Sequence, residues 1–207
     1  MKFAPVVSCF VAGLTVLLAA CAPQTEVVKL YESAAASGKQ FDRILVVTIA
    51  ADADTRRRSE TLISEKLRGD RVTAVPAYTE TGNKPTLLQQ EINDAAQRSA
   101  ADAILITHFV SVDTEANVEE GRVDVIPECR GGDPADYFLY DYEMLKEPDT
   151  VRLALTVVAV TSLYDAETSE RVWTVQSTCF KKASMDEVLL DEAIAISRQL
   201  RIDRLIR

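Results

Sequence analysis

Cysteine and histidine are the side chains best suited to nucleophilic or metal chemistry, and this sequence of 207 residues contains few of either. It has one histidine, His108, and four cysteines, at positions 9, 21, 129 and 179. His108 lies inside an apolar run, so we expect a core or sheet-face residue rather than a general base. Without a second histidine, no ready base would activate a serine or cysteine nucleophile. The sequence therefore predicts a non-enzymatic protein.

Motifs for metals and cofactors are equally sparse. The cysteines and the histidine lack the short spacing of a zinc site, and the seven glycines form no phosphate-binding loop. Weak surface binding of calcium stays open for four aspartates that do not match the helix–loop–helix spacing, Asp133, Asp136, Asp141 and Asp149. We expect no cofactor and no metal centre.

Cys21 stands at the end of the one strongly hydrophobic run. After Met1 and Lys2, residues 3–20 carry no charge and end in small side chains. A positive start, an apolar middle and a small-residue end are typical of a secretory signal. A retained signal anchor is an alternative, although the run is barely long enough to span a membrane and Pro5 interrupts it. An ordinary signal with a chance cysteine is another.

The run Leu18-Ala19-Ala20-Cys21 resembles the lipobox of bacterial lipoproteins. The resemblance implies that the thiol of Cys21 receives a diacylglyceryl group, that the signal 1–20 is removed, and that the new amine is acylated by a fatty acid such as palmitate. Several acyl chains would anchor the protein firmly, because one chain alone is marginal. Ala22 stands where an aspartate would favour the inner membrane, so we expect the outer membrane, with the protein facing the periplasm.

The charge of the expected mature chain limits its partners. Residues 21–207 hold 22 basic and 32 acidic residues, a net charge of −10. Nucleic acids are disfavoured as partners because phosphate binding needs clustered lysine and arginine. Electrostatic binding to anionic lipid is disfavoured for the same reason. We expect membrane attachment through the lipid and an envelope protein as partner.

Two cysteines remain once Cys9 leaves with the signal and Cys21 carries the lipid. In an oxidising compartment, the remaining pair predicts a disulfide between Cys129 and Cys179. Two unpaired thiols, one of them buried, are the alternative.

Residues 21–40 are small, polar and weakly periodic, which predicts a lipidated tether, and residues 41–207 predict one α/β domain. Strands separated by helical patterns, in the order β-α-β-α-β, imply a mixed sheet with parallel pairing. A long antiparallel hairpin and a C-terminal helix follow. The predicted strands are 43–49, 71–77, 101–112, 151–164 and 171–180, and the predicted helices are 54–68, 86–99 and 185–206.

Local signals refine these elements. Asp54, Thr86–Gln89 and Ser184–Glu187 are the expected helix N-caps or capping boxes. In the last strand, Trp173, Val175, Ser177 and Cys179 alternate with more polar residues and are expected to face the core. The run Arg56–Arg58 is expected to be solvated; an acidic partner facing it is the alternative, since three positive charges at the positive end of a helix dipole are mildly unfavourable.

Residues 113–150 form an acidic insertion in the predicted domain. They hold 12 acidic and 3 basic residues, which is nearly all of the net charge. Within the insertion, the tyrosine-rich run 137–142 suits a protein interface. The candidate partner-binding residues are Tyr137, Phe138, Tyr140 and Tyr142. An extra hairpin whose aromatic face packs on the sheet is the alternative.

The order of elements resembles a group of periplasmic lipoprotein domains: the amino-terminal domain of TolB, the curli secretion channel lipoprotein and the lipoproteins that activate penicillin-binding proteins. The supporting runs are RILVVTIA, AAQRSAADAILITHFV, RVWTVQSTCF and ISRQLRIDRLI, over residues 41–207. The resemblance implies a non-enzymatic adaptor on an α/β scaffold. This chain departs from the curli channel because the 113–150 segment does not resemble a membrane-spanning hairpin, and its tether is shorter than that of the activators.

Three functions remain open. The first is a lipid-anchored scaffold or assembly subunit of the bacterial envelope that acts by protein–protein contact. The second is an accessory lipoprotein of an envelope transport or secretion system that binds lipid or glycan in an apolar groove. The third is a periplasmic hydrolase, which would need a convergent polar site.

Overall fold

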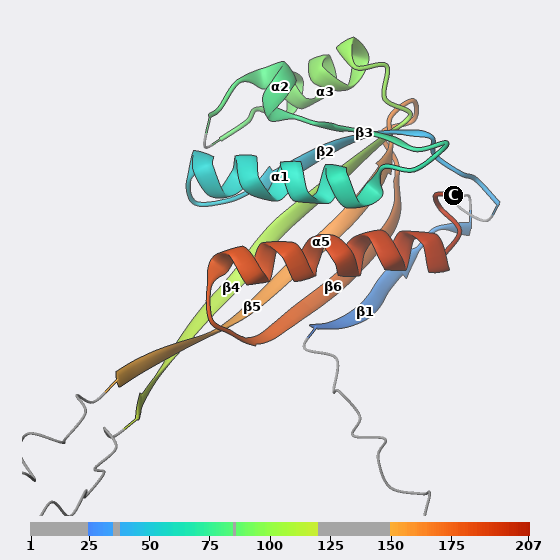
Figure 1. The fold of residues 1–207 in the computed structure, drawn as a ribbon. Helices are drawn as coiled ribbons and strands as arrows, with labels where there is room; N and C mark the ends of the chain where they lie inside the picture. The colour runs from blue at the N-terminus through green and yellow to red at the C-terminus, as the bar shows by residue number, and fades with distance from the viewer. Residues whose placement is uncertain (1–24, 35–37, 85, 120–149) are drawn as a thin grey trace, which may run out of the picture.

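The computed structural model describes residues 25–34, 38–84, 86–119 and 150–207. Here six strands form one mixed sheet on which helices pack (Figure 1). The strands are β1 (Thr25–Glu32), β2 (Arg43–Ile49), β3 (Thr73–Pro76), β4 (Ala103–Glu119), β5 (Thr150–Asp165) and β6 (Arg171–Lys182). The helices are α1 (Ala53–Leu67), α2 (Tyr78–Thr81), α3 (Gln89–Arg98) and α5 (Met185–Ile202). The predicted fold class, with its antiparallel hairpin and C-terminal helix, is confirmed.

The sheet has the strand order β1-β6-β5-β4-β2-β3. β2 pairs in parallel with both β3 and β4, as crossover connections through helices require. The pairs β4–β5, β5–β6 and β1–β6 are antiparallel. The sheet is therefore parallel at the β2 end and antiparallel at the β1 end.

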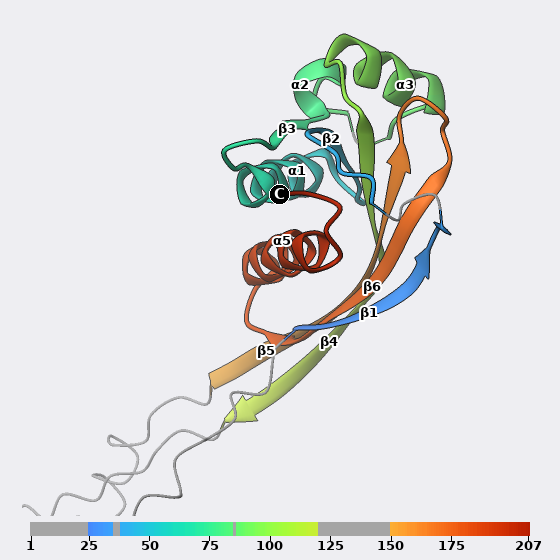
Figure 2. The ribbon, with the colours of Figure 1, turned by 90° about the vertical axis from the view of Figure 1, so that its right-hand side faces the viewer.

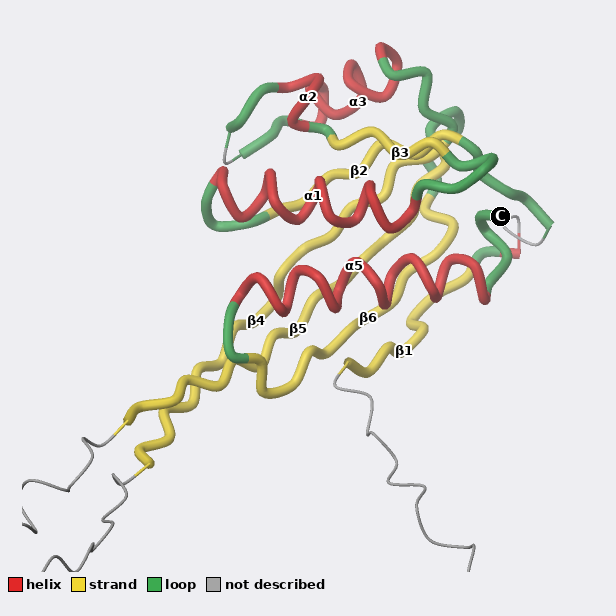
Figure 3. The backbone as a smooth tube through the Cα atoms, in the orientation of Figure 1, coloured by secondary structure: helices red, strands yellow, loops and turns green. Residues whose placement is uncertain are grey.

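Helices cover the two faces of the sheet unequally (Figures 2 and 3). α1 and α5 pack side by side on one face, which we call the helix face. α3 packs on the opposite face, against β2 and β4. The strand β2 is buried on both sides, with Ile44 and Val46 in the core under α1 and α5 and Leu45 and Val47 in the core under α3. A continuous apolar run is the expected sequence for such a strand.

Trp173 is the largest fully buried side chain of the core on the helix face. It lies between the sheet and α5, and its indole Nε1 donates to Oδ2 of Asp203 at 2.7 Å, which satisfies the buried donor. Val175, Ser177 and Cys179 face the same core and are buried. The predicted inward-facing set on β6 is confirmed.

Two of the three expected helix starts lie elsewhere. The N-cap of α1 is Asp52 rather than Asp54, and Oδ1 of Asp52 accepts from the backbone N–H of Thr55 at 2.8 Å. At α3, Glu91 accepts from the backbone N–H of Leu88 at 2.9 Å, so the helix begins after Leu88. At α5, the hydroxyl of Ser184 caps the N–H of Glu187, as predicted.

Residues 25–32 fall within the expected tether 21–40, but they form the edge strand β1. β1 pairs with β6 from Thr25 opposite Cys179 to Glu32 opposite Trp173. Lys29 also donates to Oδ1 of Asp203 at 2.6 Å. Val27, Val28, Leu30 and Tyr31 give this segment strand-forming residues, but Val28, Leu30 and Tyr31 are exposed, so no clear alternation of apolar and polar residues indicates a strand. An edge strand also depends on pairing with its one neighbour. The tether prediction is therefore corrected for these eight residues.

The strand β4 runs to Glu119, well past the predicted end at 112. Residues 113–119 were expected to open the acidic insertion, and instead they pair with residues 150–156 of β5. Cross-strand pairing therefore extends the hairpin at both strands. The remainder of the predicted insertion, residues 120–149, lies outside the described residues.

Candidate functional site

The strands β4 and β5 continue beyond the N-terminal end of α5 as a two-stranded projection (Figures 1 and 2). We call residues 112–119 and 150–155 the β4–β5 arm. A register shift between Phe109 and Ser111 marks a β-bulge at the root of the arm. A bulge adds one residue to one strand and so reverses which side chains face each side of the sheet.

The arm has one apolar face. Val157 is buried against Val188 of α5, so odd-numbered residues of β5 point to the helix face. The cross-strand pairs on that face are Val112 with Val157, Thr114 with Leu155, Ala116 with Leu153, and Val118 with Val151. The apolar stripe therefore continues the core of the domain outward, past the cover of α5.

This apolar stripe is open to solvent. The exposed fractions are 49% for Val112, 65% for Val118, 61% for Val151 and 53% for Leu153. Single exposed apolar residues are ordinary, but a contiguous set on one face of a strand pair is typical of an interaction surface. The helix face of the arm is therefore the candidate functional site.

The opposite face of the arm is polar and acidic. Asp113, Glu115 and Asn117 of β4 lie opposite Thr156, Ala154 and Arg152 of β5. An antiparallel pair with one apolar and one hydrated face is amphipathic, with a period of two residues. The arm can therefore bury one face against a partner while the other remains in water.

The sequence-predicted site residues mostly fall elsewhere. Cys21, Cys129, Tyr137, Phe138, Tyr140 and Tyr142 lie outside the described residues. Cys179 is described, and it is a buried, free thiol. The structure therefore does not support the predicted disulfide between Cys129 and Cys179. The other predictions for these residues stay predictions.

Cys179 lies in a closed environment between β6, β1 and α5. Its sulfur is 3.6 Å from Oγ1 of Thr25, 3.9 Å from the carbonyl oxygen of Val188 and 4.0 Å from Oε2 of Glu192. Burial raises the pKa of the thiol to about 11. A protonated, buried thiol is a poor nucleophile, so Cys179 is structural.

We expect Cys179 to resist alkylation in the folded protein. A pKa about two units above the ordinary value of 9.0 lowers the thiolate fraction about a hundredfold at pH 8. Iodoacetamide should therefore leave the peptide that contains Cys179 unmodified in buffer and modify it fully in denaturant, as measured by peptide mass spectrometry. Modification in denaturant that requires prior reduction would contradict a free thiol and restore the bridge.

Glu192 is a second buried polar group on the inner side of α5. Its Oε1 accepts from the hydroxyl of Ser177 at 2.7 Å, and its other hydroxyl neighbour is Thr161. Burial raises the pKa of Glu192 to about 7, and the hydrogen bonds from the two hydroxyls oppose the rise. The carboxyl lies under α5, away from solvent, so it supports the core rather than a reaction.

Arg56 is fully buried at the start of α1, which corrects the expectation that Arg56–Arg58 is solvated. Its Nε donates to Oε1 of Glu60 at 2.7 Å, one turn further along the helix. Its Nη1 donates to the carbonyl oxygen of Lys84 at 2.6 Å, and its Nη2 donates to Oγ1 of Thr81 at 2.9 Å. Arg56 therefore ties α1 to the loop after α2.

Glu60 completes this network. It accepts from the backbone N–H of Thr48 at 3.1 Å and from that of Tyr78 at 2.7 Å, at the ends of β2 and β3. Burial raises the pKa of Glu60, and the Arg56 guanidinium partly offsets the rise. Because both side chains are bonded to several elements at once, the pair is a structural clamp.

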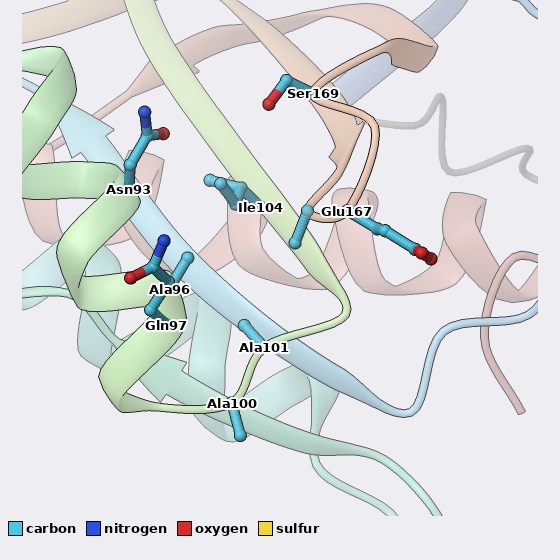
Figure 4. Close-up of a pocket in the computed structure, with 9 residues that line it drawn as sticks. Asn93, Ala96, Gln97, Ala100, Ala101, Ile104, Glu167 and Ser169 are labelled. Carbon is cyan, nitrogen blue, oxygen red and sulfur yellow. The ribbon is translucent and has the colours of Figure 1, made fainter.

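Small cavities occur in the described part of the fold. One, of about 290 Å³, lies between the end of α3 and the β5–β6 loop (Figure 4). Asn93 and Gln97 line it with four alanines, and the carboxylate of Glu167 points away from the two amides. Another, of about 230 Å³, lies at the carboxyl end of β2. Both fall below the usual range for ligand pockets, and neither is the deep apolar groove that a lipid carrier requires.

The described ranges meet neither the requirements of a metal site nor those of a membrane-spanning helix. Residues 25–34, 38–84, 86–119 and 150–207 include no group of three or more His, Cys, Asp or Glu side chains placed to hold a metal ion. Of the helices in those ranges, none has the length and apolar character needed to cross a bilayer.

Comparisons with known proteins give distant likenesses only. No protein-family model matches the sequence, and no curated protein matches it. The fold is similar to a single-substitution variant of the PelC dodecamer from Paraburkholderia phytofirmans, with 15% identity, 88% of this chain and 99% of that chain covered, and a TM-score of 0.48. It is also similar to lipoprotein GNA1162 from Neisseria meningitidis, with 15% identity, 77% and 96% covered, and a TM-score of 0.39. Likenesses this distant identify no family and carry no function to this chain.

Sequence reasoning missed the arm, although a signal for it was present. From Val110 to Val118, apolar or small residues recur at every second position among polar or acidic ones, and this alternation is out of step with the strand before the bulge between Phe109 and Ser111. The acidic residues hid the pattern, because a charged run usually indicates a solvated loop.

Proposed function

We propose that the chain is a lipid-anchored scaffold or assembly subunit of the bacterial envelope, held at the outer membrane and facing the periplasm, which acts by protein–protein contact through the β4–β5 arm. The single observation that carries the proposal is the exposed apolar face of the arm. The lipobox-like run that ends at Cys21 supports the location. No chemical step is part of this function.

A protein partner fits the arm better than a lipid surface does. Each exposed valine or leucine on the stripe gains roughly 1.5–3 kcal/mol when it becomes fully buried, so a complementary protein surface would bind it favourably. Asp113 and Glu115 on the other face oppose approach to anionic lipid. They remain hydrated in a protein complex, as charged residues at the rim of an interface do.

Two substitutions test membrane attachment and partner binding separately. We expect Cys21→Ser to abolish acyl labelling and membrane fractionation, because the lipid is attached to that thiol. We expect Leu153→Glu to leave both unchanged but to lower partner cross-linking at least tenfold, because it places a charge in the middle of the apolar stripe. The readout is a photo-cross-linking side chain introduced at Val151, which lies on the same face of the arm.

The matched control is Leu88→Glu, since Leu88 is exposed on the α3 side of the sheet. This variant should cross-link like the unmodified arm. The location would be refuted if Cys21→Ser still carried acyl label. The contact would be refuted if no adduct formed at Val151, or if Leu153→Glu and Leu88→Glu cross-linked equally.

A further inference from the structure

A second exposed apolar stripe runs along the outer side of α5. Leu190, Ile194 and Ile202 are 39%, 45% and 59% exposed, and Arg198 occupies the remaining position at the same four-residue step. Side chains four apart lie on one side of a helix. The stripe faces away from the sheet, because the inner side of α5 is occupied by Leu189, Ala193, Ile196 and Leu200. α5 therefore has apolar side chains on both sides.

The two exposed stripes have similar lengths. From Leu190 to Ile202, at 1.5 Å per residue, the helix stripe extends about 18 Å. From Val112 to Val118, at about 3.3 Å per residue, the arm stripe extends about 20 Å. Each stripe could therefore cover most of the other.

The arm and the C-terminal end of α5 carry charges of opposite sign. The second half of α5 and the residues after it carry Arg198, Arg201, Arg204 and Arg207, all exposed, whereas the exposed or half-buried Asp186, Glu187 and Asp191 lie in its first half. The one acidic residue among the arginines, Asp203, is bonded to Lys29 and Trp173. On the face opposite its apolar stripe, the arm carries Asp113 and Glu115 together with one basic residue, Arg152, and in sequence it leads into the rest of the acidic segment 113–150. The acidic residues do not lie on the apolar contact itself, so they would steer the approach of the arm toward a basic helix end rather than form ion pairs within the interface.

One molecule cannot join its own two stripes. The arm leaves the domain beyond the N-terminal end of α5, whereas the arginines lie at the opposite, C-terminal end (Figure 1). The apolar face of the arm and the outer stripe of α5 both point away from the sheet on its helix side, so they cannot face each other within one molecule. A stripe on the arm can therefore meet a stripe on α5 only in another copy.

We propose that copies of this chain associate head to tail, with the apolar face of the β4–β5 arm of one copy packed on the outer stripe of α5 of the next. This interface deepens the proposed function and rests on it, because it names a second copy of the chain as a partner of the arm. Two different surfaces meet, so the interface is heterologous, and successive copies form a ring if the rotation closes or an open chain if it does not.

The test uses two differently tagged copies of the full lipidated chain, produced together and purified in mild detergent. Unmodified copies should capture each other and form assemblies larger than two. Leu153→Glu in both copies, or Ile194→Glu in both, should lower self-capture at least tenfold, because each removes one of the two surfaces. Leu88→Glu should assemble like the unmodified chain, and circular dichroism should show all variants folded.

The decisive part of the experiment mixes the two variants. A Leu153→Glu copy keeps an intact α5 stripe, and an Ile194→Glu copy keeps an intact β4–β5 arm, so the mixture should restore capture but stop at two copies. Raised salt should weaken capture without abolishing it, because the charges are screened while the apolar contact remains.

Self-capture that is absent from the unmodified chain, or that persists in both single variants, would overturn the proposal. So would a mixture that fails to recover pairs, since that result would fit two identical surfaces meeting. If the cross-link from Val151 joins a different protein, this inference fails while the proposed function stands. If Val151 forms no cross-link at all, the proposed function fails.

Discussion

Replacing Arg56 by methionine is expected to lower the free energy of unfolding by about 3–5 kcal/mol. The substitution keeps a long side chain but removes the cation beside the fully buried Glu60, which would then be an unpaired charge in the core. The carbonyl oxygen of Lys84 and the hydroxyl of Thr81 would also lose their donors. Urea unfolding at pH 7.5, followed by circular dichroism, measures the loss.

Arg57→Met is the matched control, because Arg57 is the next residue of α1 and its side chain is half exposed. Its effect should stay within about 0.5 kcal/mol. Adding Glu60→Gln to Arg56→Met should recover part of the loss, since no buried charge then remains. Equal effects of the Arg56 and Arg57 substitutions would contradict the structural clamp.

Replacing Glu192 by glutamine is expected to stabilise the protein at pH 8 by up to about 3 kcal/mol and to leave it nearly unchanged at pH 4.5. The folded pKa of Glu192 is about 7, against an ordinary value of 4.5 for an exposed glutamate. The protonated carboxyl is therefore the form that suits the core. Glutamine resembles that form at every pH and can still accept from the hydroxyl of Ser177.

The pH dependence of this stabilisation follows from proton binding to Glu192 in the folded and unfolded states. Below pH 4.5 both states are protonated, and Glu192 costs the fold nothing. Between pH 4.5 and about 7 the unfolded chain releases the proton while the folded chain keeps it, so stability falls as pH rises. Above pH 7 the loss of folding stability caused by Glu192 has reached its full value and no longer changes with pH.

Unfolding curves from pH 5 to pH 8 for the unmodified chain and Glu192→Gln would test whether the stability difference grows as pH rises. Their difference isolates Glu192, because any contribution from Glu60 is common to both. Glu65→Gln, on the exposed side of α1, should track the unmodified chain. A constant difference across this range would contradict the raised pKa.

Sequence pattern predicted the parts of the fold that are stabilised by burial. The β2 run is apolar at four successive positions, Ile44 to Val47, because both faces of the strand are covered. The alternation from Trp173 to Cys179 identified the core side of β6, since only one set of side chains faces α5. The cap at Ser184 was predicted because its bond to Glu187 is local.

The parts that were missed depend on distant neighbours. β1 forms because β6 offers it a free edge; half of its residues are apolar, but of these only Val27 packs against the core, so its own pattern did not identify a strand. The end of β4 is stabilised by β5, from which it is separated in sequence by the acidic segment. Arg56 and its two arginine neighbours are identical in type, and only packing against the α2 loop distinguishes the buried one.

The position of β1 also governs how the domain would sit on a bilayer. Four residue steps separate Cys21 from Thr25, a reach of at most about 14 Å. Thr25 lies opposite Cys179, which lies opposite Val157 near the root of the arm, only two strand spacings away. Acyl chains on Cys21 would therefore hold the arm close to the leaflet surface. Molecules confined to that shallow layer would meet at a far higher effective concentration than molecules diffusing through the whole compartment, so even a weak contact between arms and helices would be occupied.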